Sequence, residues 1–71
     1  MPSFGVRMAE ARIRQGVTKA KVASLLGVST TTVHAWESGT RPKEHQLARV
    51  AEFLGEDPIQ LQKELFGVER G

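Results

Sequence analysis

The sequence predicts an all-α fold of five short helices. Glycines, capping residues and prolines divide its 71 residues into short segments, in which apolar residues recur three or four positions apart. No segment alternates polar and apolar residues over a useful length, so no strand is expected. The length suits one small domain, and the absence of cysteine excludes disulfides, thiolate zinc sites and cysteine nucleophiles.

The first three helices are marked by the residues at their ends. Glycine after an apolar-periodic run ends a helix in the left-handed conformation, and Gly16 and Gly27 stand at such positions. Serine and threonine cap the first N–H groups of a helix, which favours helices beginning after Thr18 and Ser29. The predicted helices span residues 4–15, about 18–26 and about 30–37.

The last two helices follow a connector at residues 40–42. A run of apolar residues at helical spacing predicts a helix from about residue 44 to residue 54, ended by Gly55. Asp57 is a good N-cap and Pro58 suits the first helical position, so a fifth helix is expected to reach about Phe66. Residues 1–67 are therefore expected to form the domain, and residues 68–71 a flexible C-terminal tail.

Charge is distributed unevenly along the chain. Residues 1–16 carry a net charge of +2, residues 17–43 carry +3 and residues 44–71 carry −3. A basic N-terminal part favours a polyanionic partner, although this feature alone is better explained by a solvated surface with incidental charge. No apolar run suits a membrane span and no signal peptide is expected, so a cytoplasmic location is predicted.

The turn between the second and third helices is the most informative local feature. Residues 27–29, Gly-Val-Ser, end one helix and cap the next. Ala23 is small enough for a second helix to approach closely, and Val33 and Trp36 are expected to point inward. This is the layout of a helix-turn-helix, in which a short second helix enters the DNA major groove.

One register of glycines, caps and core residues runs through about residues 4–66. It comprises Gly16-Val17-Thr18-Lys19, Val22-Ala23, Leu26-Gly27-Val28-Ser29, Val33, Trp36-Glu37-Ser38-Gly39, Arg41-Pro42, Leu47, Ala51, Phe53-Leu54-Gly55 and Leu61. In this register the chain resembles the phage repressor and Cro-type (xenobiotic-response-element-like) helix-turn-helix family. The resemblance implies a lambda-repressor-like, five-helix DNA-binding domain of a bacterial or phage transcriptional regulator that binds paired half-sites as a dimer.

The resemblance makes residues 30–37 the recognition helix, and its outward positions are Thr30, Thr31, Thr32, His34 and Ala35. The family reads bases mostly with the first two residues of this helix and the sixth, here Thr30, Thr31 and Ala35. Threonine can donate or accept at a base edge, whereas alanine can only meet a thymine methyl. Because no residue at these three positions makes bidentate contacts, modest direct discrimination assisted by DNA shape is expected.

The resemblance also implies a set of phosphate contacts around the recognition helix. Lys19 stands where the family commonly has glutamine, and both reach a phosphate while lysine adds charge. The N–H groups at the starts of the second and third helices can hold phosphates as well. The expected phosphate-contacting residues are Thr18, Lys19, Ser29, Ser38, Thr40, Arg41 and Lys43, with Arg14 as a further candidate.

Arg12 and Glu37 match family positions that form a partly buried ion pair between the first helix and the end of the recognition helix. The alternative is two independent surface charges, and the family register favours the pair. Its expected role is to fix the recognition helix and to orient the arginine toward the DNA backbone.

Two helices carry apolar residues on a second face. Val6, Ala9 and Ile13 lie opposite the core stripe of the first helix, which indicates either scattered surface hydrophobicity or a contact for a protein partner. Ile59 and Phe66 lie on the outer side of the fifth helix. There we expect a dimer contact, because members of the family often pair through this helix.

No residue constellation indicates catalysis, a metal or a cofactor. His34 and Glu37 are three residues apart, a spacing that can share a metal, but two ligands without a third make a weak site. The sequence thus favours a sequence-specific, double-stranded DNA-binding regulator, with repression as the expected action, over an enzyme. The alternative is an antitoxin-like or adaptor module of the same fold whose main partner is a protein.

Overall fold

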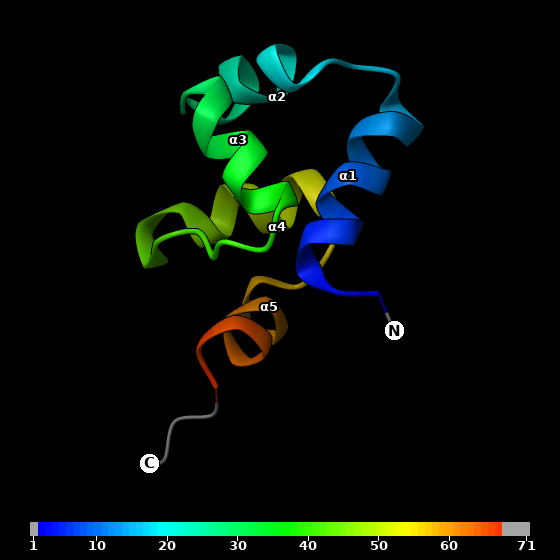
Figure 1. Ribbon diagram of the computed structural model, residues 1–71. Coiled ribbons are helices and arrows are strands. Elements are labelled where there is room, and N and C mark those ends of the chain that lie inside the picture. Colours follow the sequence, from blue (N-terminus) through cyan, green and yellow to red (C-terminus); the bar gives the residue numbers. More distant parts are fainter. Residues whose placement is uncertain (1, 68–71) are drawn as a thin grey trace. The chain divides into compact units, whose positions relative to one another are not determined.

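The computed structural model describes residues 2–67, and every element in that range is helical. The prediction of an all-α fold with five helices is confirmed. The expected tail at residues 68–71 lies outside the described residues, and within them no helix has the length and apolar character needed to span a membrane. The elements are α1 (Phe4–Gln15), α2 (Lys19–Leu26), α3 (Thr30–Glu37), a 3₁₀ turn η1 (Glu44–Gln46), α4 (Leu47–Leu54) and α5 (Pro58–Phe66) (Figure 1).

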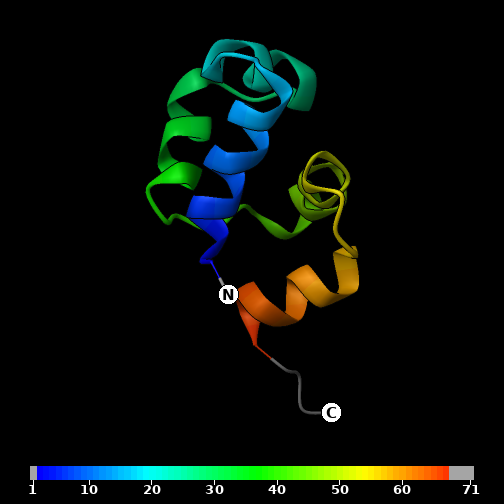
Figure 2. The ribbon, with the colours of Figure 1, turned by 90° about the vertical axis from the view of Figure 1, so that its right-hand side faces the viewer.

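The helices fall into two compact units, Met1–Thr40 with α1 to α3 and Arg41–Gly71 with η1, α4 and α5. In the first unit, α1 and α2 both contact α3, and α1 lies beside α3 (Figure 2). All three helices contribute apolar side chains to the core of this unit, as Met8, Val22 and Val33 illustrate with exposed fractions of 0%. This packing fixes the orientation of α3 within the unit.

The capping residues named from the sequence begin their helices. Thr18 Oγ1 accepts the Lys21 N–H at 3.1 Å, and Ser29 Oγ accepts the Thr32 N–H at 3.1 Å. Between them Gly27 has φ of 72°, the left-handed conformation that ends α2. The turn that joins α2 to α3 is therefore specified by local chemistry at both ends.

Gly5 marks a close approach of α1 to the end of α3. A Cβ atom placed on Gly5 would lie 2.7 Å from the backbone oxygen of Glu37 and 3.1 Å from that of Trp36. Atoms at those distances overlap, so only a residue without a side chain allows α1 to lie this close to the two carbonyls.

In the second unit, α4 packs on α5. The start of α4 differs from the prediction, because residues 44–46 form a 3₁₀ turn and the α-helix begins only at Leu47. Lys43 has no side-chain oxygen to cap a helix. Instead, its N–H donates to Gln46 Oε1 at 2.8 Å while the Gln46 N–H donates to Lys43 O at 2.9 Å, which closes a tight turn before the helix.

Candidate nucleic-acid interface

α3 has one buried side and one exposed side. Val33 and Trp36 are buried, with exposed fractions of 0% and 2%. Of the five candidate base-contacting residues, Thr30, Thr31 and His34 are exposed and Thr32 and Ala35 are half-buried. The exposed side therefore offers two hydroxyls near the start of the helix and an imidazole one turn later.

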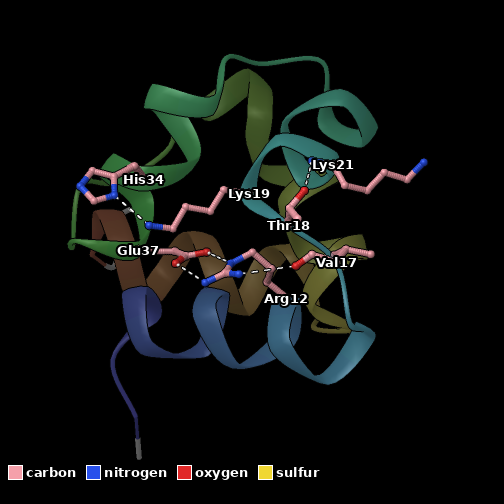
Figure 3. A network of polar contacts seen from close by, with 7 residues as sticks. All are labelled: Arg12, Val17, Thr18, Lys19, Lys21, His34 and Glu37. Atoms are coloured by element: carbon pink, nitrogen blue, oxygen red, sulfur yellow. Dashed lines mark hydrogen bonds and ion pairs between the residues drawn. The ribbon is translucent and has the colours of Figure 1, made fainter.

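Lys19 and His34 are brought together from α2 and α3. Lys19 Nζ lies 3.0 Å from His34 Nδ1, so the first side chain of α2 reaches across to the fifth residue of α3 (Figure 3). His34 is exposed and Lys19 half-buried. A candidate phosphate contact and a candidate base contact thus form one polar pair, which sequence reasoning missed because the two residues are fifteen positions apart.

Thr18 and Ser29 are engaged as helix caps, and Ser29 Oγ also lies 3.0 Å from Thr32 Oγ1, so a phosphate would have to share the Ser29 hydroxyl with Thr32. An oxygen that accepts an N–H hydrogen bond can still donate its own hydrogen. The first N–H groups of α2 and α3 have no carbonyl partner within the helix and carry the positive end of the helix dipole. Both helix starts therefore present N–H donors suited to an anionic oxygen, and the Thr18 hydroxyl adds an O–H donor at the start of α2.

Arg12 binds Glu37 through two hydrogen bonds. Arg12 Nε donates to Glu37 Oε2 at 2.7 Å and Nη2 donates to Oε1 at 3.2 Å (Figure 3). Arg12 Nη1 also reaches the carbonyl oxygen of Val17 at 3.5 Å. The hydrogen bond with Glu37 is the main cause of a raised pKa of Arg12, so the guanidinium stays charged. The two residues that the sequence predicted as a pair do form one.

The residues after α3 are only partly free to make the phosphate contacts that the sequence predicts. Ser38 and Thr40 are exposed, yet their N–H groups are bound to α3 carbonyls: Ser38 donates to His34 O at 3.0 Å and Thr40 to Ala35 O at 2.9 Å. Their hydroxyls remain the groups that can meet a phosphate. Arg14 and Lys43, the other basic candidates, have exposed side chains.

Arg41 makes contacts that the sequence did not predict. Its Nη1 donates to Leu65 O at 2.7 Å, and its guanidinium carbon lies 5.4 Å from the centroid of the Phe66 ring. Both contacts are at the C-terminal end of α5, where carbonyl groups lack helical partners and attract a cation. Arg41 therefore has partners within its own unit, which a phosphate contact would have to replace or share.

Arg7 is a buried charge that sequence reasoning did not single out. Its exposed fraction is 9%, and Nη1 donates to the Pro2 carbonyl oxygen at 2.7 Å. The sequence around Arg7 does not indicate that it is buried, because an arginine in a helix is usually solvated. Its bond to the chain before α1 points to a structural role in holding that segment.

Several apolar side chains remain exposed. On α1, Val6 is 48% exposed and Ile13 is 67% exposed, while Ala9 is half-buried. On α5, Ile59 is 60% exposed and Phe66 is 40% exposed, the latter beside Arg41. These are the two faces that the sequence identified as candidate protein contacts.

Within residues 2–67, no group of three or more histidine, aspartate or glutamate residues is placed to hold a metal. His34 and Glu37, which are spaced so that they could bind one metal ion, have other partners. His34 contacts Lys19, and Glu37 binds Arg12. Their polar atoms are thus used in contacts between helices.

Comparison with known proteins identifies a family for the chain. A family model described as helix-turn-helix domain matches residues 3–63, which includes α1 to α4 and most of α5. No curated protein and no solved structure matches the chain significantly.

Proposed function

Because the chain belongs to the helix-turn-helix domain family, a class of DNA-binding domain, we propose that it is a transcriptional regulator that recognises a specific sequence in double-stranded DNA. The observation that carries the proposal is the exposed side of α3, where Thr30, Thr31 and His34 face solvent while Val33 and Trp36 anchor the helix. This side of α3 would lie in the major groove, in the manner of the phage repressor and Cro-type proteins.

Base recognition would rest on small polar contacts. Thr30 and Thr31 offer hydroxyls to base edges and methyl groups to thymine, and the half-buried Thr32 and Ala35 border the contact. None of these four forms the paired hydrogen bonds that arginine or glutamine makes with a base. DNA shape would therefore supply much of the specificity.

Phosphate contacts would hold the domain in register on both sides of the groove. Lys19 and the starts of α2 and α3 are suited to one strand. The hydroxyls of Ser38 and Thr40 follow α3 in the chain and suit the other strand, while the exposed Lys43 of the second unit is a further candidate phosphate contact. Since such contacts carry no base information, they set affinity and orientation while α3 sets sequence preference.

The active form would be a dimer on an inverted repeat. One domain of this kind makes few base contacts, so two linked half-sites raise both affinity and specificity. The exposed Ile59 and Phe66 on α5 are the apolar residues we assign to the pairing. Binding over a promoter would block transcription, so repression is the simplest action of such a dimer.

Selection from a randomised duplex DNA pool tests the function directly. An enriched inverted repeat, with half-site centres about one helical turn apart, supports the dimeric regulator. Charged residues at both Ile59 and Phe66 should halve the sedimentation mass of the free protein and weaken DNA binding. Failure of a folded sample to enrich any sequence would refute sequence-specific binding, and an unchanged mass would refute the α5 dimer.

A second candidate function is favoured by the exposed apolar residues of α1. Val6 and Ile13 lie on the side of α1 away from its core stripe, and they suit a protein partner in an antitoxin-like or adaptor role. Ile13→Glu separates the two functions. The regulator should keep its DNA affinity in this variant, whereas an adaptor should lose its protein partner.

A further inference from the structure

The contact between Lys19 and His34 fixes which ring nitrogen of His34 carries hydrogen. Lys19 Nζ lies 3.0 Å from His34 Nδ1, and an ammonium group has only donors. Nδ1 must therefore accept, which requires a neutral ring with its hydrogen on Nε2. The nitrogen left for another partner is a donor.

We propose that Lys19 makes His34 a hydrogen-bond donor toward DNA, so that His34 selects a base whose major-groove edge presents acceptors. This inference rests on the proposed function, since it assigns the polarity of one contact in the same interface. Guanine presents two acceptors, N7 and O6, whereas cytosine presents only the N4 donor. His34 therefore favours guanine and disfavours cytosine at the base pair it meets.

The position of His34 makes it the strongest polar reader on α3. It is exposed on the fifth residue of the helix, one turn beyond Thr30 and Thr31. A threonine hydroxyl rotates and can donate or accept, so it discriminates weakly between base edges. An imidazole whose acceptor is already occupied presents one polarity only, and one polarity is what discrimination between guanine and cytosine requires.

Lys19 acts as a positioning residue in this scheme. Its ammonium has three N–H groups, and the contact with His34 uses one of them. The other two can bind a phosphate, so one side chain joins a backbone contact to a base contact. Lys21, two residues further on α2, is exposed and extends away from His34, which makes it a matched control (Figure 3).

The first test needs no DNA. Nitrogen-15 shifts of the ring nitrogens, measured at about pH 8 where a free histidine is neutral, report the tautomer of His34 and of the exposed His45 in the same sample. We expect His34 to be protonated at Nε2 in the wild type and to shift toward a mixture of tautomers in Lys19→Met. The Lys21→Met variant should leave it unchanged. A hydrogen on Nδ1 in the wild type, or no shift in Lys19→Met, would overturn this proposal. Neither result would count against the proposed DNA binding itself.

The second test reads the base preference. In selection experiments, His34→Phe should lower the guanine-over-cytosine preference about two- to tenfold at one position of each half-site and leave the other positions unchanged. Lys19→Met should lower overall affinity and also lose that preference, whereas Lys21→Met should change affinity alone. A cytosine preference in the wild type, or an intact guanine preference in Lys19→Met, would refute the assignment. If the wild type selects no sequence, the base readout fails together with the proposed function, and the ring shifts still report the tautomer.

Discussion

Arg12 on α1 and Glu37 at the last residue of α3 form an ion pair with two hydrogen bonds, of 2.7 Å and 3.2 Å. The Glu37 side chain is only 9% exposed and that of Arg12 is 20% exposed. The pair therefore ties the end of α3 to α1 in a place largely shielded from water, where a partner left alone is costly.

We predict that Arg12→Met destabilises the protein by about 2 kcal/mol, because it leaves the Glu37 carboxylate shielded and without its two donors. The double variant Arg12→Met/Glu37→Met should be more stable than Arg12→Met alone. Urea unfolding followed by the fluorescence of Trp36, the single tryptophan, measures both.

The matched control is Arg14→Met, since Arg14 is an exposed arginine on the same helix. It should change the free energy of unfolding by less than about 0.5 kcal/mol. A double variant no more stable than Arg12→Met would contradict the view that the stranded carboxylate causes the loss.

The same pair predicts how this stabilisation depends on pH. The hydrogen bond with Glu37 raises the pKa of Arg12 above its usual value. A group whose pKa is raised by folding contributes fully below its unfolded value and loses that contribution only as the pH rises through the folded value. For an arginine both values are far above neutral, so the stability difference between wild type and Arg12→Met should be constant between about pH 7 and pH 9. Unfolding curves across that range check it, and a difference that shrinks as the pH rises would contradict it.

The parts of the structure that could be predicted from sequence are those set by neighbours along the chain. Thr18 and Ser29 cap the N–H group three residues later, and Gly27 ends a helix by adopting a left-handed conformation. Such bonds span few residues and need specific side chains, so they leave a clear signal. The ion pair of Arg12 and Glu37 spans 25 residues, and only the family register pointed to it.

The rest depends on three-dimensional contacts between residues of ordinary type. Nothing in the sequence marks the Lys19 side chain as a partner of His34, or Gly5 as the point where α1 meets the carbonyls of α3. At the start of α4, Gln46 Oε1 accepts a hydrogen bond from the Lys43 N–H. Residues 44–46 form a 3₁₀ turn there in place of the expected α-helical turn. Long flexible side chains such as those of Lys19 and Gln46 can make contacts in many places, and the close approach at Gly5 depends on how two helices pack, so the sequence positions of these residues carry little information.

We predict that Gly5→Ala destabilises the protein by about 1–3 kcal/mol, because the added methyl group would lie 2.7 Å from the Glu37 carbonyl oxygen. The usual effect in a helix is the opposite, a gain of about 0.5–1 kcal/mol from reduced backbone entropy. The midpoint of thermal unfolding distinguishes the two. Ser24→Ala, at an exposed position of α2, is the control for helix propensity alone and should not lower the midpoint. A Gly5→Ala variant more stable than wild type would show that the two helices separate at little cost.

Thr31→Glu should abolish specific DNA binding while leaving the fold intact. Thr31 is exposed on α3, so a carboxylate there costs little stability, but in the groove it would face base acceptors and phosphates. We expect affinity to fall at least about a hundredfold, measured by fluorescence anisotropy with the selected duplex. Gln62→Glu adds the same charge at an exposed site on α5 and should cost less than about threefold. Equal losses in the two variants would mean that net charge, and not the face of α3, controls binding.

A basic residue after α3 can either stabilise the end of α5 or bind a DNA phosphate, and variants of Arg41 and Lys43 distinguish these two roles. If its bond to Leu65 O and its contact with Phe66 persist on DNA, Arg41→Met should destabilise the protein through the C-terminal end of α5 and leave the salt dependence of binding unchanged. Lys43→Met should do the reverse, lowering the slope of log affinity against log salt by about one while stability stays constant. Salt titrations and urea unfolding of both variants give the four values needed. A slope lowered by about one in Arg41→Met would show that the guanidinium leaves the end of α5 for a phosphate, since counterion release counts only the charges that meet the DNA.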